Sequence, residues 1–348
     1  MQHTHGGDWA AFLEEYGTEP LDFSASVSPL GVPEGVQAAI RRAAAASDRY
    51  PDPECRALRA AIAAREELPR EWVLCGNGAS ELIWRAVCAL RPGRALVTAP
   101  CFGEYEAALE AVGCAISRFP PAASFELTER ILDEIVPGLE LLILCNPNNP
   151  TGLTIGPPLL RAIIRRCEEA GTRLLLDECF IDFLDEPALH TAKAMLGSFP
   201  SLLILRAFTK LCGMAGLRLG YALCADADCL GAMRRAGPPW SVSLLAQKAG
   251  LAALEERDHI ERVRALVRAQ RPRLQKELRA LGLKVIPGEA NFLLFQSAAP
   301  LCDPLRARGI LIRSCADFHG LDGSWYRTAV RTGPENERLI AALKEILT

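Results

Sequence analysis

The sequence predicts an α/β protein with a mainly parallel sheet flanked by helices and a second, smaller α/β unit. Short apolar runs alternate with helical patterns rich in Ala, Leu, Arg and Glu from about residue 72 to residue 225. This alternation favours a parallel sheet covered on both faces. Polar, Gly and Pro residues directly follow several of the apolar runs, at the strand ends where open α/β sheets bind their ligands. The 348 residues are enough for one large and one small unit.

In the large unit, apolar runs predict strands at 72–75, 95–98, 141–145, 173–177, 202–205 and 219–224. Helical patterns lie between these strands, and the clearest are at 104–112, 157–170 and 227–236. The Ala-rich stretch 38–46 also favours helix, because Ala has the highest helix propensity.

Beyond the large unit, residues 243–280 predict one or two long basic helices, interrupted near Pro272. Residues 283–348 predict the smaller unit, with a closing helix at 334–347 and strands that begin near Lys284, Asn291, Ile310 and Tyr326. We therefore expect an N-terminal segment of the small unit at 1–45, a large unit at 46–245 and a small C-terminal unit at 246–348.

The composition indicates a chain without nucleic-acid or membrane partners. Apolar residues make up 50% of the sequence and the net charge is only -3, so no charge excess favours nucleic acid. No apolar run approaches the roughly 20 residues that a spanning helix needs, and the first residues lack a signal-peptide pattern. The 13 cysteines are scattered without metal-ligand spacing. We expect reduced thiols, a cytoplasmic location and no metal site.

Lys210 is the first candidate catalytic residue. It follows the apolar run 202–205, and Arg218 comes eight residues later in a Gly-rich stretch. A nucleophilic lysine reacts with carbonyl groups, and an arginine suits a phosphate. The pair fits pyridoxal 5'-phosphate (PLP), which has an aldehyde and a phosphate on one ring. A lysine in a loop is more often a solvated surface charge, so this prediction depends on partners elsewhere in the chain.

Three other strand ends supply such partners. The run 174–176 ends in Asp177, which could pair with a pyridine nitrogen or act as a helix N-cap. The run 141–145 ends in a segment rich in Asn, Pro and Gly, which is also typical of a simple turn. The Gly-rich segment 75–81 joins a strand to a helix, where free backbone N–H groups can bind a phosphate.

Together, these segments resemble the fold-type I PLP enzymes of the aspartate aminotransferase superfamily. Residues 146–152, Asn-Pro-Asn-Asn-Pro-Thr-Gly, match a motif that is highly specific to it. The resemblance implies that Lys210 binds PLP covalently, that Asp177 pairs with the pyridine nitrogen and that Asn149 binds the 3'-oxygen. The residues implied around the phosphate are Gly78, Ala79, Ser80, Thr209 and Arg218.

The resemblance also assigns the aromatic residue that stacks on the cofactor ring. We choose Phe102 for this role over Tyr105, which we expect in the core. Position 207, often Ser or Thr in relatives, is Ala207 here. One phosphate hydrogen bond is therefore expected to be missing or replaced.

The N-terminal region resembles the L-threonine-O-3-phosphate decarboxylase family, which serves cobalamin biosynthesis. The opening His5-Gly6-Gly7-Asp8 and the segment 21–31 keep that family's pattern, with Asp8, Ser26 and Ser28 where Asn is usual. The resemblance implies substrate-binding roles for His5, Gly6 and Ser26. For His5, the alternative is a disordered terminal residue.

Phe180 points to the same branch. Aminotransferases usually place a tyrosine three residues after the aspartate, where its hydroxyl binds the 3'-oxygen of the ring. Here that residue is Phe180, so Asn149 must bind the oxygen without it.

Residues 326–339 resemble the segment that carries the substrate-carboxylate arginine, and Arg327 matches that arginine. Arg331 occupies a position that is commonly Gly in the aminotransferases. It either binds the substrate phosphate or is a charge at the rim of the site. Together with Asn149, these two arginines complete the predicted substrate-binding set.

Tyr50, in the segment Arg49-Tyr-Pro-Asp-Pro-Glu54, resembles the tyrosine that crosses a dimer interface to the neighbouring PLP phosphate. The resemblance therefore implies a homodimer. The alternative is a packed tyrosine in a Pro-rich turn.

Three functions remain open from the sequence. The first is PLP-dependent decarboxylation of L-threonine O-3-phosphate to (R)-1-aminopropan-2-yl phosphate. The second is a histidinol-phosphate or related aminotransferase, which shares the cofactor residues. The third is a PLP-binding regulator or inactive relative, which the presence of Lys210, Asp177, Asn149 and Arg218 disfavours.

Overall fold

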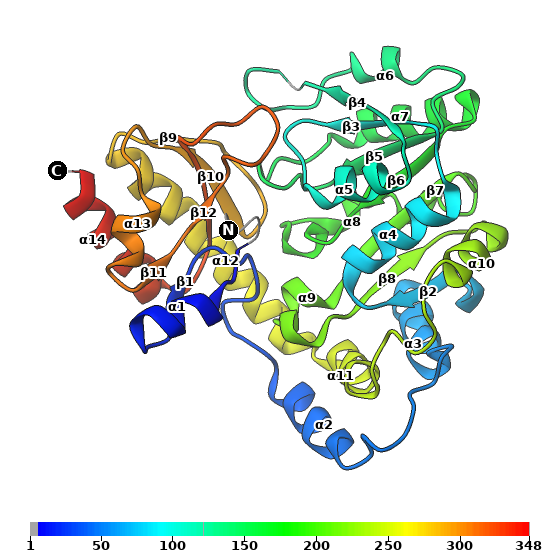
Figure 1. Ribbon diagram of the computed structural model, residues 1–348, viewed down its shortest axis with the longest axis horizontal. Coiled ribbons are helices and arrows are strands. Elements are labelled where there is room, and N and C mark those ends of the chain that lie inside the picture. The colour runs from blue at the N-terminus through cyan, green and yellow to red at the C-terminus, as the bar shows by residue number, and fades with distance from the viewer. Residues whose placement is uncertain (1–5, 121, 348) are drawn as a thin grey trace.

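The computed structural model describes residues 6–120 and 122–347. Its largest element is a seven-stranded sheet with strand order β2-β8-β7-β6-β5-β3-β4 (Figure 1). Only β8 runs antiparallel to its neighbours. The strands are β2 (Val73–Gly76), β3 (Arg94–Thr98), β4 (Ala115–Phe119), β5 (Leu141–Cys145), β6 (Arg173–Asp177), β7 (Leu202–Ala207) and β8 (Gly220–Leu223).

This sheet confirms the predicted α/β fold and all six strands expected in it. The seventh strand, β4, was missed because it lies at the edge of the sheet, where only Phe119 is buried. A strand with one buried residue has neither an apolar run nor an alternating pattern to indicate it.

Helices cover both faces of the large sheet (Figure 1). Side chains alternate between the faces along each strand, so Leu142 and Leu144 pack in one apolar cluster while Leu141 and Ile143 pack in another. The first cluster includes α3 (Arg56–Glu66), α7 (Pro157–Ala170) and α11 (Leu244–Glu255). The second includes α4 (Gly78–Leu90), α5 (Glu104–Ala111) and α10 (Ala227–Arg235).

A smaller antiparallel sheet has the strand order β12-β13-β10-β9. Its strands are β9 (Lys284–Val285), β10 (Phe292–Gln296), β12 (Arg313–Ser314) and β13 (Trp325–Ala329). Two helices, α12 (Arg257–Ala280) and α14 (Gly333–Leu347), share an apolar cluster with it. The N-terminal strand β1 (Leu21–Asp22) pairs in parallel with β11 (Ile310–Leu311). The division at residues 45 and 245 stays a prediction.

The remaining elements are short or lie at the surface. The α-helices among them are α1 (Trp9–Tyr16), α2 (Glu34–Ala44), α6 (Ile131–Glu134), α8 (Pro187–His190), α9 (Phe208–Leu211) and α13 (Cys302–Arg306). The 3-10 turns are Arg70–Trp72, Ile181–Phe183, Lys193–Met195 and Ala215–Leu217. Within the described ranges, no helix is both long and apolar enough to span a membrane.

The predicted interruption near Pro272 is wrong. The chain breaks at Glu256, between α11 and α12, and Pro272 lies inside α12. Proline removes one backbone hydrogen bond from a helix. Residues on both sides of it, such as Val267 and Leu274, are buried, so the packed face keeps the helix continuous.

Candidate active site

The site lies where β3, β5, β6 and β7 end at the same edge of the large sheet. These strands are mutually parallel, so the segments that follow them meet there. Asp177 is the last residue of β6, and Lys210 follows β7 in the short helix α9. Because β6 and β7 are neighbours, the sheet brings the predicted carboxylate and the predicted lysine to one place.

The Asp177 carboxylate is buried and bonded on both oxygens. The Tyr105 hydroxyl donates to Oδ2 at 2.6 Å, and the Cys179 backbone N–H donates to Oδ1 at 2.9 Å. Tyr105 is fully buried, and burial together with the Asp177 charge raises its pKa well above the usual value. Tyr105 therefore remains a neutral donor that holds Asp177 in position. The expectation of a core tyrosine missed this second role.

The Lys210 amine lies beside the Phe180 ring, with the charges of Asp177, Arg218 and Arg327 nearby. Its Nζ is 5.2 Å from the centroid of Phe180. Burial, assisted by the nearby Arg327 charge, lowers the pKa of Lys210 to about 8. A lysine with a lowered pKa has more of the neutral amine near neutral pH, which is the nucleophilic form.

Arg327 joins three separate parts of the chain at the site. From β13 of the smaller sheet, its guanidinium donates to the Asn149 side-chain oxygen and, at 3.1 Å, to the Ser24 carbonyl oxygen. Burial lowers its pKa to about 10, and its Nε has no hydrogen-bond partner. A buried cation with an unused donor suits a carboxylate ligand.

The Gly-rich turn at the start of α4 lies against Arg218. Gly78 has a φ of +77°, and a Cβ at this position would lie 2.8 Å from Arg218 Nη2. The Asn77 side chain does not cap α4 but donates to the Ser241 carbonyl oxygen at 2.9 Å. The first turn of α4, which contains Ala79 and Ser80, is therefore uncapped by a side chain and can bind an anion together with Arg218.

Two further predicted cofactor residues lie beside these groups. Thr209, next to Lys210, is buried. Phe102 is half-buried and packs edge-to-face on Tyr105, with 5.6 Å between ring centroids. Since Tyr105 bonds Asp177, Phe102 lies close to that carboxylate.

The N-terminal segment reaches the same place. His5 lies outside the described residues. A Cβ on Gly6 would lie 2.3 Å from the Ser24 carbonyl oxygen, so only glycine fits there. The Ser26 Oγ is buried without a hydrogen-bond partner, and the Ser28 N–H donates to the Lys210 carbonyl oxygen at 2.8 Å. Ser26 thus has a polar atom without a partner, two residues before Ser28, which binds the Lys210 backbone.

Arg331 already has partners within the protein. Its Nη2 lies 2.6 Å from Glu335 Oε1, and its Nη1 donates to the Asp22 carbonyl oxygen at 3.1 Å. Its Nε is buried without a hydrogen-bond partner, and the two alternatives for Arg331, phosphate binding and a rim charge, stay predictions. Its pairing with Glu335 favours a structural role in holding the N-terminal segment.

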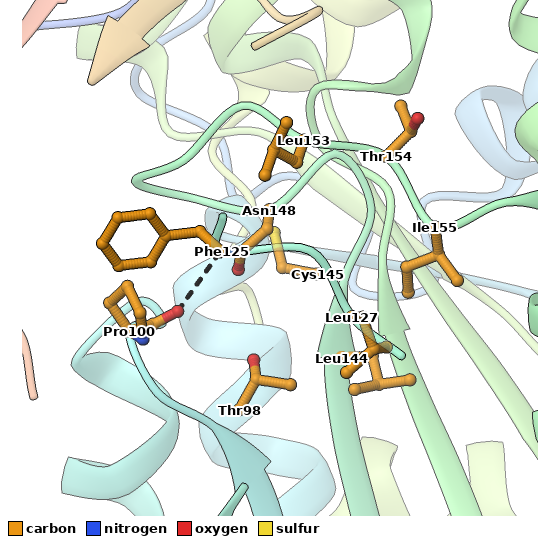
Figure 2. A pocket seen from close by; sticks show the side chains of 10 residues that line it. All are labelled: Thr98, Pro100, Phe125, Leu127, Leu144, Cys145, Asn148, Leu153, Thr154 and Ile155. Carbon is orange, nitrogen blue, oxygen red and sulfur yellow. Dashed lines mark hydrogen bonds between the residues drawn. The ribbon is translucent and has the colours of Figure 1, made fainter. Parts of the chain in front are cut away.

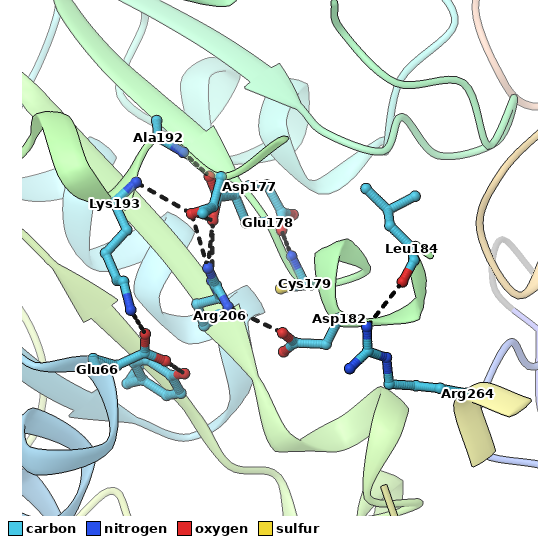
Figure 3. Close-up of polar contacts among 12 residues, drawn as sticks. Glu66, Asp177, Glu178, Cys179, Asp182, Leu184, Ala192, Lys193, Arg206 and Arg264 are labelled. Carbon is cyan, nitrogen blue, oxygen red and sulfur yellow. Dashed lines mark hydrogen bonds and ion pairs between the residues drawn. The ribbon is translucent and has the colours of Figure 1, made fainter. Parts of the chain in front are cut away.

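The buried pair Glu178–Arg206 was not predicted from the sequence (Figure 3). Arg206 Nη2 lies 2.8 Å from Glu178 Oε2, and Thr191 and the Ala192 N–H also donate to this carboxylate. Burial raises the pKa of Glu178. Burial also disfavours the charged form of Arg206, but the Glu178 charge holds the pKa of Arg206 well above the usual value. The pair joins the residue after Asp177 to the strand before Lys210. The sequence did contain a signal for this pair, because Glu178 and Arg206 lie at the ends of two neighbouring strands and have opposite charges.

A small cavity of about 30 Å³ lies beside the Asn-Pro segment (Figure 2). The Asn148 side chain donates to the Pro100 carbonyl oxygen at 3.2 Å and to Thr151 Oγ1 at 3.1 Å. The bond to Pro100 joins the segments after β3 and β5, and the bond to Thr151 lies within the second of them, next to Asn149.

No metal site accompanies these residues. Among the residues that the structure describes, no group of three or more His, Cys, Asp or Glu side chains could hold a metal ion. The site's charged groups are instead the isolated Asp177, Lys210, Arg218 and Arg327.

Tyr50 lies on the surface, 81% exposed, with its ring centroid 4.8 Å from that of Trp240, which is itself 46% exposed. The packed-tyrosine alternative does not fit this exposure. Two large aromatic side chains open to solvent are typical of a contact surface.

Comparisons with known proteins identify the family of the chain. Residues 18–343 match the family model of aminotransferase class I and II. Threonine-phosphate decarboxylase of Salmonella typhimurium is 40% identical, over 99% of this chain and 96% of that protein. Histidinol-phosphate aminotransferase of Symbiobacterium thermophilum is 37% identical, over 92% of this chain and 88% of that protein.

Solved structures share the fold. The histidinol-phosphate aminotransferase from Clostridium acetobutylicum superposes with a TM-score of 0.88 at 27% identity, covering 94% of this chain and 98% of that one. The L-threonine-O-3-phosphate decarboxylase from Porphyromonas gingivalis gives a TM-score of 0.83 at 24% identity, covering 94% and 99%. The chain therefore belongs to the aminotransferase class I and II family.

Proposed function

We propose that this chain is a PLP-dependent enzyme that decarboxylates L-threonine O-3-phosphate to (R)-1-aminopropan-2-yl phosphate, in cobalamin biosynthesis. The observation that carries the proposal is the 40% identity to the Salmonella typhimurium threonine-phosphate decarboxylase over 99% of this chain. Phe180 beside Lys210, where aminotransferases usually have a tyrosine, supports the same choice.

The residues present fit PLP. The uncapped start of α4 and Arg218 form a cradle for a phosphate, which a Cβ at Gly78 would fill. Thr209 lies next to Lys210 and can add a hydroxyl to the phosphate site. Asp177 supplies a buried carboxylate for the pyridine nitrogen, and Phe102 an aromatic face. When bound, PLP accepts the electron pair of the bond that breaks at the substrate Cα.

The substrate would be held by its two anionic ends. Arg327, with its unused Nε, binds the carboxylate and thereby sets how the Cα substituents are oriented. His5, Gly6 and Ser26 are the candidates for the phosphate end, and the unpartnered Ser26 Oγ supports this assignment. Arg331 would support them through the Asp22 carbonyl contact.

Lys210 would move the proton. Its amine has a pKa of about 8, so both protonation states are populated near neutral pH. The neutral amine is needed to bind the aldehyde, and the protonated amine can deliver a proton to Cα after CO2 leaves. Asp177, held by Tyr105, would supply the carboxylate that pairs with the ring nitrogen.

A histidinol-phosphate aminotransferase is the second candidate. The relative from Symbiobacterium thermophilum supports it, at 37% identity. Lys210, Asp177, Asn149 and Arg218 suit either reaction, so only the reaction products distinguish the two.

A homodimer in the cytoplasm completes the proposal. The exposed pair Tyr50–Trp240 supports a contact through which Tyr50 reaches the neighbouring PLP phosphate. An apolar groove between α2 and α11, lined by residues such as Ala43 and Leu251, offers further surface for a second copy. The thirteen free cysteines support a reducing compartment.

The reaction is tested by product analysis. Purified PLP-loaded protein, given O-phospho-L-threonine without a keto acid, is expected to release CO2 and 1-aminopropan-2-yl phosphate in equal amounts. If it leaves phosphothreonine unchanged but transfers the amino group of histidinol phosphate to 2-oxoglutarate, the aminotransferase alternative is correct.

Replacement of Tyr105 by Phe tests the support of Asp177. The change removes the hydroxyl that donates to Oδ2 at 2.6 Å and leaves a buried carboxylate oxygen without that bond. We expect PLP to bind roughly 10-fold more weakly, about 1.4 kcal/mol, in an equilibrium titration of PLP-free protein. Tyr16→Phe on α1 is the matched control and should bind PLP normally. Equal affinities for the two variants would show that Tyr105 is a packing residue only.

The lowered pKa of Lys210 predicts a pH-dependent stability. The unfolded chain keeps the lysine proton up to about pH 10.5, whereas the folded PLP-free protein loses it near 8. The buried charge therefore costs stability below pH 8, and this cost disappears as the pH rises toward 10.5. Urea unfolding should find the PLP-free Lys210→Met variant about 1–3 kcal/mol more stable than the original at neutral pH, with a smaller difference at pH 10. The exposed Lys276→Met on α12 is the control. A difference that does not change with pH would contradict the lowered pKa.

A further inference from the structure

Cys55 and Cys75 form a pair of thiols beside the phosphate-binding turn. Cys55 lies immediately before α3, and Cys75 lies in β2, directly before Gly76. Both side chains belong to the same apolar cluster and line the same cavity of about 170 Å³. Helix α3 and strand β2 share this cluster, although the two cysteines are 20 positions apart in the sequence.

The backbone around the two thiols is held together. Cys55 has a left-handed φ of 46°, and its N–H donates to the Asp52 carbonyl oxygen at 3.1 Å. Arg59, one turn along α3, donates to the Val73 carbonyl oxygen of β2 at 2.7 Å. These bonds fix the start of α3 against β2 and hold both cysteines at the wall of the same cavity.

The two thiols are unequal. The interaction between them lowers the pKa of Cys55 and raises the pKa of Cys75, and burial opposes ionisation of both. The Arg59 charge favours the thiolate at both positions, while Asp52 and Glu54 oppose it at Cys55. Cys55 is therefore the more readily ionised thiol, and the thiolate is the form that reacts with oxidants.

We propose that Cys55 and Cys75 form a reversible intramolecular disulfide when the protein meets a hydroperoxide. The Cys55 thiolate attacks one peroxide oxygen, the O–O bond breaks, and Cys55 becomes a sulfenic acid while hydroxide leaves. The Cys75 sulfur then displaces the sulfenic oxygen, and the S–S bond forms. In sum, two thiols and one hydrogen peroxide give one disulfide and two waters.

The position of this disulfide gives it a consequence for the site. Cys55 follows Tyr50 by five residues, and Cys75 precedes Gly78 by three. A bond between them would tie the segment that carries the exposed Tyr50 to the strand that ends in the phosphate-binding turn. By closing a loop of about 20 residues, it would also restrict the unfolded chain.

Peptide mapping tests the proposal. The PLP-loaded protein is treated with hydrogen peroxide, its remaining thiols are blocked with iodoacetamide, and the tryptic peptides are analysed by mass spectrometry. Trypsin releases Cys55 in residues 50–56 and Cys75 in residues 71–85, each as the only cysteine of its peptide. We expect these two peptides to be linked, with two hydrogens lost, and to separate on treatment with dithiothreitol. The oxidised protein should also have a higher Tm than the reduced protein.

Matched variants and a second cysteine pair control the result. Cys55→Ser and Cys75→Ser should each abolish the linked peptide, whereas Cys88→Ser, at an exposed cysteine, should retain it. Cys224 and Cys229 also interact, and trypsin leaves both in the peptide 219–234. Oxidation of the exposed Cys88 shows that the peroxide has reacted with the protein. The proposal is overturned if, at that point, iodoacetamide has blocked both Cys55 and Cys75. It is equally overturned if Cys224 and Cys229 are the pair that oxidises. The mapping of the unmodified chain decides the question even where a serine variant does not fold.

Discussion

The structure depends on the parallel pairing of β6 with β7. This register places Asp177 opposite Leu205 and brings the ends of both strands to one edge, so the carboxylate and the lysine meet although 33 residues separate them in the sequence. The buried pair Glu178–Arg206 lies across the same two strands. Removal of Arg206 would leave the buried Glu178 carboxylate without its ion-pair partner, which costs several kcal/mol. The pair therefore stabilises the register on which the site depends.

Both sheets contribute residues to the site, and Arg327 connects them. It comes from the smaller sheet, binds Asn149 at the edge of the larger one and binds the N-terminal segment at Ser24. A substrate carboxylate that binds Arg327 would therefore be linked through it to the smaller sheet, the larger sheet and the N-terminal segment. Residues far from Lys210 in the sequence can therefore determine how the substrate is oriented. That orientation determines which bond at Cα breaks.

Much of the fold and the main site residues could be predicted because short sequence signals determine them. Lys210, Asp177 and Asn149 each follow an apolar strand run, and strand ends meet at one edge in a parallel sheet. The contacts Tyr105–Asp177, Glu178–Arg206 and Cys55–Cys75 could not be predicted in this way, because each depends on how separate segments pack in three dimensions. The predicted interruption near Pro272 was wrong for a related reason: packing keeps the helix continuous through Pro272, against its local propensity. Arg331 had the expected charge, but Glu335 neutralises it.

The central claim is that Lys210 is the residue that binds PLP at this strand edge. The most direct test is to reduce the PLP-loaded protein with sodium borohydride, which makes the link permanent, and to map the modified tryptic peptide by mass spectrometry. We expect the pyridoxyl group on Lys210 alone, and no stable label in the Lys210→Met variant. A label on another lysine, such as Lys193, or the absence of any label on the original protein, would show that Lys210 does not bind PLP.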